Sequence, residues 1–239
     1  MRRTAPAALC LVTALPLALA LTACSSGSSD SSGGTAKPKQ SASQDPNAGL
    51  PTGTQLKKAL APASFFATGF AVDPSGARDS GGTYTEPSSA PASAKPDCEK
   101  LGQTSWISIT GVSGVSFAQN DYVSKNTSED IAQEIDTFRG TTAATVLKDL
   151  ERVASACATF TDSQTHTKVK VAGRATSGLG DSAYTVTLTD SAWENGTTLI
   201  AARVGPNVVS VMSTDGHDNG AATAKKLTEQ IVASLKKTA

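Results

Sequence analysis

The chain has 239 residues, with 21 basic and 21 acidic side chains and 5% aromatic residues. Because it has no excess of basic charge to neutralise phosphates, nucleic acid is excluded as an expected partner. Its hydrophobic content of 38% is enough for one folded domain, and no segment after the N-terminal one is apolar for long enough to span a membrane.

The N-terminus has the three zones of a secretory signal peptide. Two arginines follow the first methionine, residues 5–22 are apolar, and Ala23 is a small residue at the expected cleavage position. The apolar run could also serve as a permanent transmembrane anchor, but Pro16 and the small-residue end favour a cleaved signal. We therefore expect residues 1–23 to be removed.

The four residues Leu21-Thr22-Ala23-Cys24 resemble the bacterial lipobox, whose cysteine receives a diacylglyceryl thioether before cleavage. One acyl chain holds a protein only marginally at a membrane, whereas two chains on one residue hold it firmly. We expect Cys24 to anchor the mature protein to the extracytoplasmic face of the cell membrane. Removal of the signal leaves 19 basic and 21 acidic residues, a net charge of −2.

The segment after the anchor is rich in Ser, Gly, Pro and Lys over residues 25–52. Such a composition cannot bury enough apolar surface to offset the entropy of ordering, so we expect a disordered linker. Flexible-chain scaling gives these 28 residues a root-mean-square length of about 30 Å. With Cys24, the linker occupies residues 24–52, and the folded domain is expected over residues 53–239.

The first part of the domain alternates short apolar segments with turn residues. Residues 54–60 predict a helix with Thr54 as its N-cap, and Phe65, Phe66 and residues 70–72 predict a strand. Residues 73–96 are rich in Gly, Ser and Pro and predict a long exposed loop, which is either disordered or functional. A short helix is expected to start at Cys98.

The middle of the chain carries the clearest patterns. Residues 115–123 and 131–138 predict two strands of a β-hairpin. Residues 141–158 predict a helix, because apolar residues recur there at the spacing of one buried face. That face consists of Leu147, Leu150, Ala154 and Cys157.

The last part predicts three or more strands and a final helix. Residues 168–171 and 184–188 alternate, and threonines in the second segment predict one wet and one dry face. Residues 199–204 and 208–212 flank a Gly-Pro-Asn turn and predict a hairpin, followed by an amphipathic helix over residues 219–236. Hairpin strands with few helices predict a single-domain α+β fold with an antiparallel sheet and packed helices.

The cysteines divide into two groups. Cys10 leaves with the signal and Cys24 carries the lipid, so Cys98 and Cys157 remain as an even pair in an oxidising compartment. We expect a disulfide between them, which would stabilise the domain by roughly 4 kcal/mol through loop closure. Two free buried thiols are the alternative, and a zinc site is disfavoured because CxxC spacing is absent.

Several short motifs resemble one family in their order along the chain. They are Asp97-Cys98, Ala156-Cys157-Ala158, Gly178-Leu179-Gly180-Asp181, and the run from Arg203 to Val209 before the final helix. Over residues 53–237 this order resembles the extracytoplasmic sensor domain of actinobacterial PknH-type serine/threonine kinases and its free-standing lipoprotein relatives. The resemblance implies an α+β domain with a groove beside its sheet that binds an extracellular ligand. The second cysteine pair common in that family is missing here.

No pattern indicates catalysis, a cofactor or a metal. The GxSxG motif of a nucleophile elbow is absent, and His166 and His217 lie in loop-like segments. Residues 178–183 match GxGxxA, but a strand rather than a helix follows, which predicts a tight turn instead of a dinucleotide site. We therefore expect the protein not to be an enzyme.

Four residues are weak candidates for ligand binding. Glu134 and Asp136 fall on one face of their strand, roughly 7 Å apart, where they are either paired carboxylates or ordinary charges on a wet face. Trp106 and Tyr122 either line a groove or pack in the core.

Two functions remain open from the sequence. The first is a membrane-anchored, non-enzymatic domain that binds a small ligand or acts in sensing. The second is an envelope structural or interaction protein that docks on a partner protein or a cell-wall polymer. No group of residues in the sequence supports a third possibility, that the protein is a hydrolase.

Overall fold

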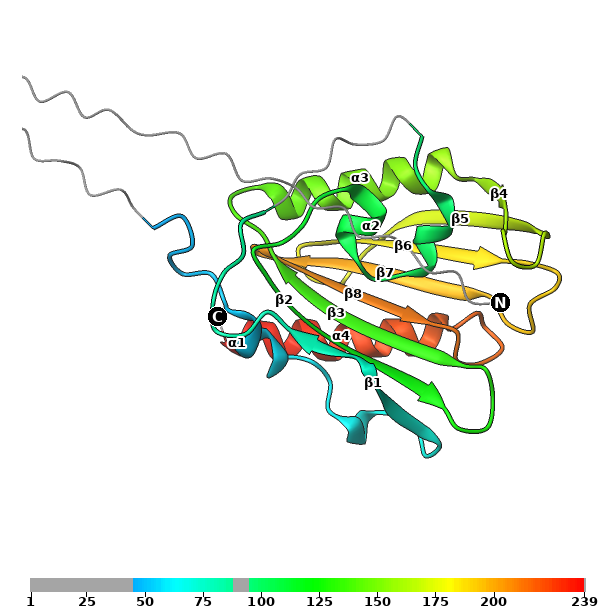
Figure 1. Ribbon diagram of the computed structural model, residues 1–239, viewed down its shortest axis with the longest axis horizontal. Helices are drawn as coiled ribbons and strands as arrows, with labels where there is room; N and C mark the ends of the chain where they lie inside the picture. The colour runs from blue at the N-terminus through cyan, green and yellow to red at the C-terminus, as the bar shows by residue number, and fades with distance from the viewer. Residues whose placement is uncertain (1–44, 88–94, 239) are drawn as a thin grey trace, which may run out of the picture. The chain divides into compact units, whose positions relative to one another are not determined.

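The computed structural model describes residues 45–87 and 95–238. They form one body around an eight-stranded antiparallel sheet with the strand order β1-β2-β3-β8-β7-β6-β5-β4 (Figure 1). The strands are β1 Phe70–Asp79, β2 Ser116–Ser124, β3 Asp130–Thr137, β4 Thr159–Thr161, β5 Lys168–Thr176, β6 Ser182–Thr189, β7 Thr197–Val204 and β8 Asn207–Ser213. The predicted α+β fold with an antiparallel sheet is confirmed.

Helices cover both faces of this sheet. They are α1 Gly53–Lys57, η1 Ala63–Phe65, η2 Cys98–Gly102, α2 Trp106–Thr110, α3 Thr142–Ala156 and α4 Ala221–Thr238. Helix α4 packs against β7 and β8 on one face, while α3 packs against β5, β6 and β7 on the other (Figure 1). The two long predicted helices are thereby confirmed.

The central strands are buried on both faces. In β7, Leu199 belongs to the cluster beneath α3, and the next residue, Ile200, belongs to the cluster beneath α4. Every residue of β8 is buried. The predicted wet face of the threonine-alternating strand β6 is only partly correct, because Thr187 and Thr189 are half-buried while Thr185 is only 3% exposed.

The predicted turns are present. The β2–β3 and β7–β8 pairs are antiparallel hairpins, the second closing at Gly205 and Pro206. Gly178 and Gly180 both have positive φ between β5 and β6, which confirms a tight turn at that motif.

Strand β1 begins only at Phe70, so the strand predicted to include Phe65 and Phe66 is wrong there, and β1 extends into a segment for which the sequence predicted a loop. Its register against β2 shifts between Asp73 and Arg78, and Pro74 is tolerated there because β1 is at the edge of the sheet. The Gln119 amide donates to the Gly76 carbonyl at 3.0 Å across this shift. The loop prediction for residues 73–79 is therefore wrong, and residues 88–94 lie outside the described residues.

Residues 45–52, predicted as linker, lie against the folded body. Arg139 Nε donates to Asn47 Oδ1 at 2.8 Å, and Ser116 Oγ donates to the Pro51 carbonyl at 2.6 Å. The N-cap of α1 is Thr52 rather than Thr54, and its N–H donates to Gln55 Oε1 at 2.7 Å. The domain thus begins earlier than predicted. The predicted signal, Cys24 and the rest of the linker lie outside the described residues.

The disulfide between Cys98 and Cys157 is confirmed, with the two Cα atoms 5.5 Å apart. It joins η2 to the C-terminal end of α3. Such a bond is typical of proteins outside the reducing cytoplasm. Among the described residues, no helix is both long enough and apolar enough to cross a membrane.

The two ends of the sheet differ in what they carry. The proximal end holds residues 45–57, which contact Ser116 at the start of β2 and Arg139 after β3. The β7–β8 turn and the last turn of α4 lie at the same end, because Pro206 and Leu235 line one cavity with Leu50 and Leu56. The distal end holds the loops after β2, β6 and β8 (residues 125–129, 190–196 and 214–220). We use these two names below.

Candidate functional site

Glu134 and Asp136 form a buried carboxyl pair on β3. Their side chains are 5% and 6% exposed, and the two carboxyl groups are hydrogen-bonded to each other. The predicted shared face is therefore correct, but the wet face is wrong. Thr104, in the segment between η2 and α2, covers the pair and donates its hydroxyl to Glu134 Oε2 at 2.7 Å.

Burial determines the ionisation of this pair. Removal from water raises the pKa of Glu134, although its hydrogen bond from Thr104 opposes the rise. Burial also raises the pKa of Asp136 well above its usual value, and the neighbouring Glu134 raises it further. The pair therefore retains a proton at a pH where exposed carboxyl groups have lost theirs.

Unpartnered polar atoms occur in the same layer of the protein. Within the described residues, Asp136 Oδ2, Ser210 Oγ and Trp106 Nε1 are buried without a hydrogen-bond partner. Ser210 lies directly across the sheet from Glu134, on the neighbouring strand β8. Orphaned buried groups of this kind each cost about 1–3 kcal/mol, so this part of the core is not optimised for stability alone.

The four residues proposed from the sequence do not form one site. Trp106 lies in the core beneath α3, on the same side of the sheet as the carboxyl pair. Tyr122 lies in the core beneath α4, on the opposite side, where its ring stacks on Phe66 at a centroid distance of 3.6 Å. Trp106 and Tyr122 are 1% and 3% exposed, so neither lines an open groove.

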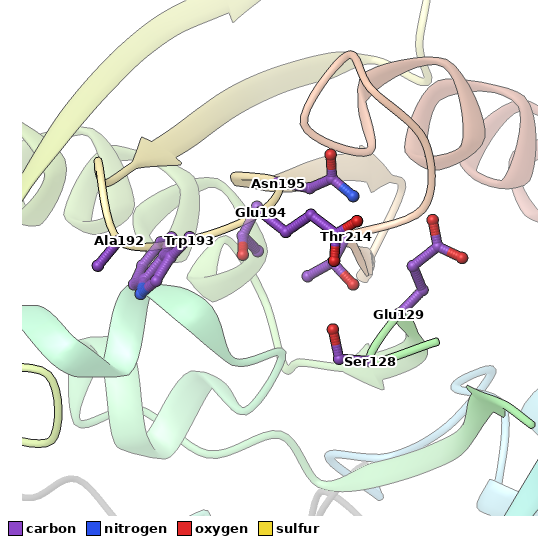
Figure 2. A pocket seen from close by; sticks show the side chains of 8 residues that line it. Ser128, Glu129, Ala192, Trp193, Glu194, Asn195 and Thr214 are labelled. Carbon is purple, nitrogen blue, oxygen red and sulfur yellow. The ribbon is translucent and has the colours of Figure 1, made fainter. Parts of the chain in front are cut away.

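An open pocket of about 350 Å³ lies at the distal end, away from these residues. It is formed by the β2–β3 turn, the β6–β7 loop and the start of the β8–α4 loop. Figure 2 shows the side chains around it, with Ala192 and Trp193 on one side and Glu129 on the other. The remaining lining residues are Ser128, Glu194, Asn195, Thr197 and Thr214.

The sequence folds this way locally because polar side chains pin the three loops together. Glu129 Oε1 accepts from the Gly216 N–H at 3.1 Å, which ties the β2–β3 turn to the β8–α4 loop. The Asp130 N–H donates to Thr214 Oγ1 at 2.8 Å beside it. The Asn219 side chain accepts from the Gly196 N–H at 2.9 Å and holds the β6–β7 loop in place.

The pocket is anionic. The Gly216 N–H and the Thr127 hydroxyl lower the pKa of Glu129, which therefore stays ionised. Glu194 adds a second, exposed carboxylate. Asp130, next to Glu129, has its pKa raised to about 6 by burial and by the charge of Asp121. A tryptophan side chain with two carboxylates and several hydroxyl or amide groups suits a small polar cation.

This pocket was not predicted from the sequence, because its residues come from three separate loops. The aromatic–acid–amide run Trp193-Glu194-Asn195 was the one local signal, since a tryptophan in a polar loop is unusual. Among the described residues, no group of three His, Cys, Asp or Glu side chains is placed to hold a metal ion. No protein-family model matches the chain, and no curated protein matches it.

Proposed function

We propose that this chain is an extracytoplasmic lipoprotein, anchored to the cell membrane through Cys24, whose domain binds a small polar cation without catalysing a reaction. The observation that carries the binding role is the distal pocket, where Trp193, Glu129 and Glu194 surround about 350 Å³ of open space. The sequence resemblance to PknH-type sensor domains agrees with such a sensor-like role.

The location of the pocket supports the proposal. The described chain begins at the proximal end, to which the predicted linker is covalently joined, and the pocket lies at the distal end. A domain held from its proximal end presents the pocket away from its attachment. The disulfide is consistent with placement outside the cytoplasm.

The alternative, docking on a partner protein or a wall polymer, has less support. Large exposed apolar side chains among the described residues are Val72, Ile107 and Val123. Val72 is paired with Tyr122 and Val123 is paired with Ala71, so the two valines project from opposite faces of the sheet. Scattered apolar residues of this kind do not make an interface.

Binding is tested with the chain from residue 24 onward carrying Cys24→Ala, which contains every described residue. We expect choline and glucosamine to raise its melting temperature, and glucose, which lacks the ammonium group of glucosamine, to have no effect. Trp193→Ala and Glu194→Gln should each weaken binding about tenfold. Glu151→Gln, an exposed change on α3, is the control. Equal responses to glucose and glucosamine would refute a cation pocket.

The anchor is tested separately in cells that process lipoproteins. Cys24→Ala in the full chain should leave the protein unprocessed or release it from the membrane fraction. If the variant stays with membranes at the mature mass, the lipid anchor is wrong, and the binding role is unaffected.

A further inference from the structure

The proximal end carries a second cavity, larger than the distal pocket and of different chemistry. Its volume is about 540 Å³. Its half-buried apolar residues are Leu50, Pro51 and Pro206, with Leu56 and Leu235 almost fully buried behind them, and Lys58 also lines it. We call this cavity the proximal groove.

Some basic residues around the proximal groove form salt bridges and others do not. Three basic residues at this end have acidic partners, in the pairs Lys57–Asp79, Arg139–Glu86 and Arg203–Asp181 at 3.1, 3.1 and 3.3 Å. Lys58, Lys236 and Lys237 form no salt bridge within residues 45–87 and 95–238. All three lysines are exposed.

The position of these lysines is informative. Lys236 and Lys237 occupy the last turn of α4, next to Leu235 in the groove wall. Their interaction with the helix dipole explains their presence in that turn. The α4 dipole does not explain Lys58, which is the C-cap residue of α1 and lines the same groove. Of the three lysines, Lys58 lines the cavity, and Lys236 and Lys237 follow the wall residue Leu235 along α4, in a protein without excess positive charge.

We infer that the proximal groove binds an anionic phospholipid of the membrane, with an acyl chain against its half-buried apolar wall and the headgroup at Lys58, Lys236 and Lys237. An apolar cavity rimmed by cations is complementary to an anionic amphiphile, because the two parts of the ligand need different surroundings. This end is also the one to which the predicted linker is joined. The presence of a membrane beside it rests on the proposed function.

The test uses the chain from residue 24 onward with Cys24→Ala, so that attachment through the lipid plays no part. The described residues all belong to one compact unit. We expect this chain to co-sediment with vesicles that mix phosphatidylglycerol and phosphatidylcholine, and not with vesicles of phosphatidylcholine alone. Binding should weaken as salt is added.

Two variants separate the headgroup from the acyl chain. Replacing Lys58, Lys236 and Lys237 by Gln should weaken vesicle binding roughly fivefold for each lysine, or about a hundredfold in total. Leu50→Ser, at a half-buried wall position, should weaken binding to vesicles but not binding to a heparin column. The matched control replaces Lys148, Lys168 and Lys170 by Gln, which removes the same charge from α3 and β5.

Each other outcome overturns the inference. Equal losses in the two lysine variants would mean unspecific attraction. A concentration-dependent dimer that Leu50→Ser abolishes would make a second copy the occupant. Vesicle binding that emerges only after residues 25–44 are deleted would make that segment the occupant. None of these results bears on choline binding at the distal pocket, so the two proposals fail separately.

Discussion

The Glu134 and Asp136 carboxyl groups are hydrogen-bonded to each other in the protein interior, two residues apart on β3. Thr104 closes the space above them by donating its hydroxyl to Glu134. Two charged residues from β1 and β2 also act on Glu134, namely Arg78 and Asp121. Because one cation faces three carboxyl groups, the pair is most stable with a shared proton.

We predict that the free energy of unfolding falls as the pH rises above the unfolded-state carboxyl pKa of about 4. In the unfolded chain these carboxyl groups lose their protons near pH 4. Their raised pKa values in the folded protein mean that it binds more protons than the unfolded chain above that pH, so stability decreases as the pH increases. Asp130, with a pKa of about 6, adds to the decline between about pH 4 and pH 6. Urea unfolding across this range measures the slope.

Asp136→Asn identifies the source of that slope. The asparagine amide still donates to Glu134 but does not titrate, so the slope should flatten and stability at pH 8 should rise by about 1 kcal/mol or more. Glu151→Gln on the exposed face of α3 should leave the slope unchanged. If Asp136→Asn lowers stability equally at every pH, the shared proton is wrong.

The sequence predicted the helices and strands better than it predicted which of their faces are buried. The buried stripe of α3 and the hairpins of β2–β3 and β7–β8 follow from local periodicity and turn residues, and all were correct. Whether a sheet face is wet depends on which helix returns to cover it. That is a tertiary property, and it explains the errors at Thr185 and at the carboxyl pair.

The candidate site was harder to predict for the same reason. Trp106 and Tyr122 were grouped because both are amphipathic aromatics, but their strand and helix place them on opposite faces of the sheet. The distal pocket arises from three loops far apart in the sequence, joined by hydrogen bonds such as Gly216 to Glu129. Local sequence patterns carry no information about hydrogen bonds between distant loops.

We predict that the disulfide contributes much of the stability of the domain. Replacing both Cys98 and Cys157 by Ala opens a loop with a sequence separation of 59 residues and should lower the free energy of unfolding by about 4 kcal/mol. A reducing agent should destabilise the wild-type protein by a similar amount and leave the double variant unchanged. A loss below about 1 kcal/mol in urea unfolding would show that the reduced protein is held by its packing alone.

We predict that Gly180 cannot be replaced without strain. Its φ is +60°, and a Cβ atom there would lie 2.2 Å from the Arg203 carbonyl oxygen. Gly180→Ala should therefore cost about 3 kcal/mol or more in thermal or urea unfolding. Gly178→Ala is the matched control, because φ is also positive but no atom lies within 4 Å of the added Cβ. Its cost should be about 1 kcal/mol, and equal costs at the two positions would contradict the close approach.

The amide of Gln133 links β3 to the segment after α1, and we predict that this link depends on both ends of the amide. Gln133 Oε1 accepts from the Ala61 N–H at 2.9 Å, and Nε2 donates to the Ala61 carbonyl at 3.1 Å. Because Gln133 is fully buried, Gln133→Ala leaves both backbone groups unpaired and should cost about 3–5 kcal/mol.

Gln133→Glu tests the same link through its pH dependence. A protonated glutamic acid keeps one acceptor and one donor, whereas an ionised one has no donor for the Ala61 carbonyl and is a buried charge. We expect the variant to be close to the wild type in stability near pH 4 and several kcal/mol less stable near pH 8. A pH-independent loss in urea unfolding would show that the amide fills space there without pairing the backbone.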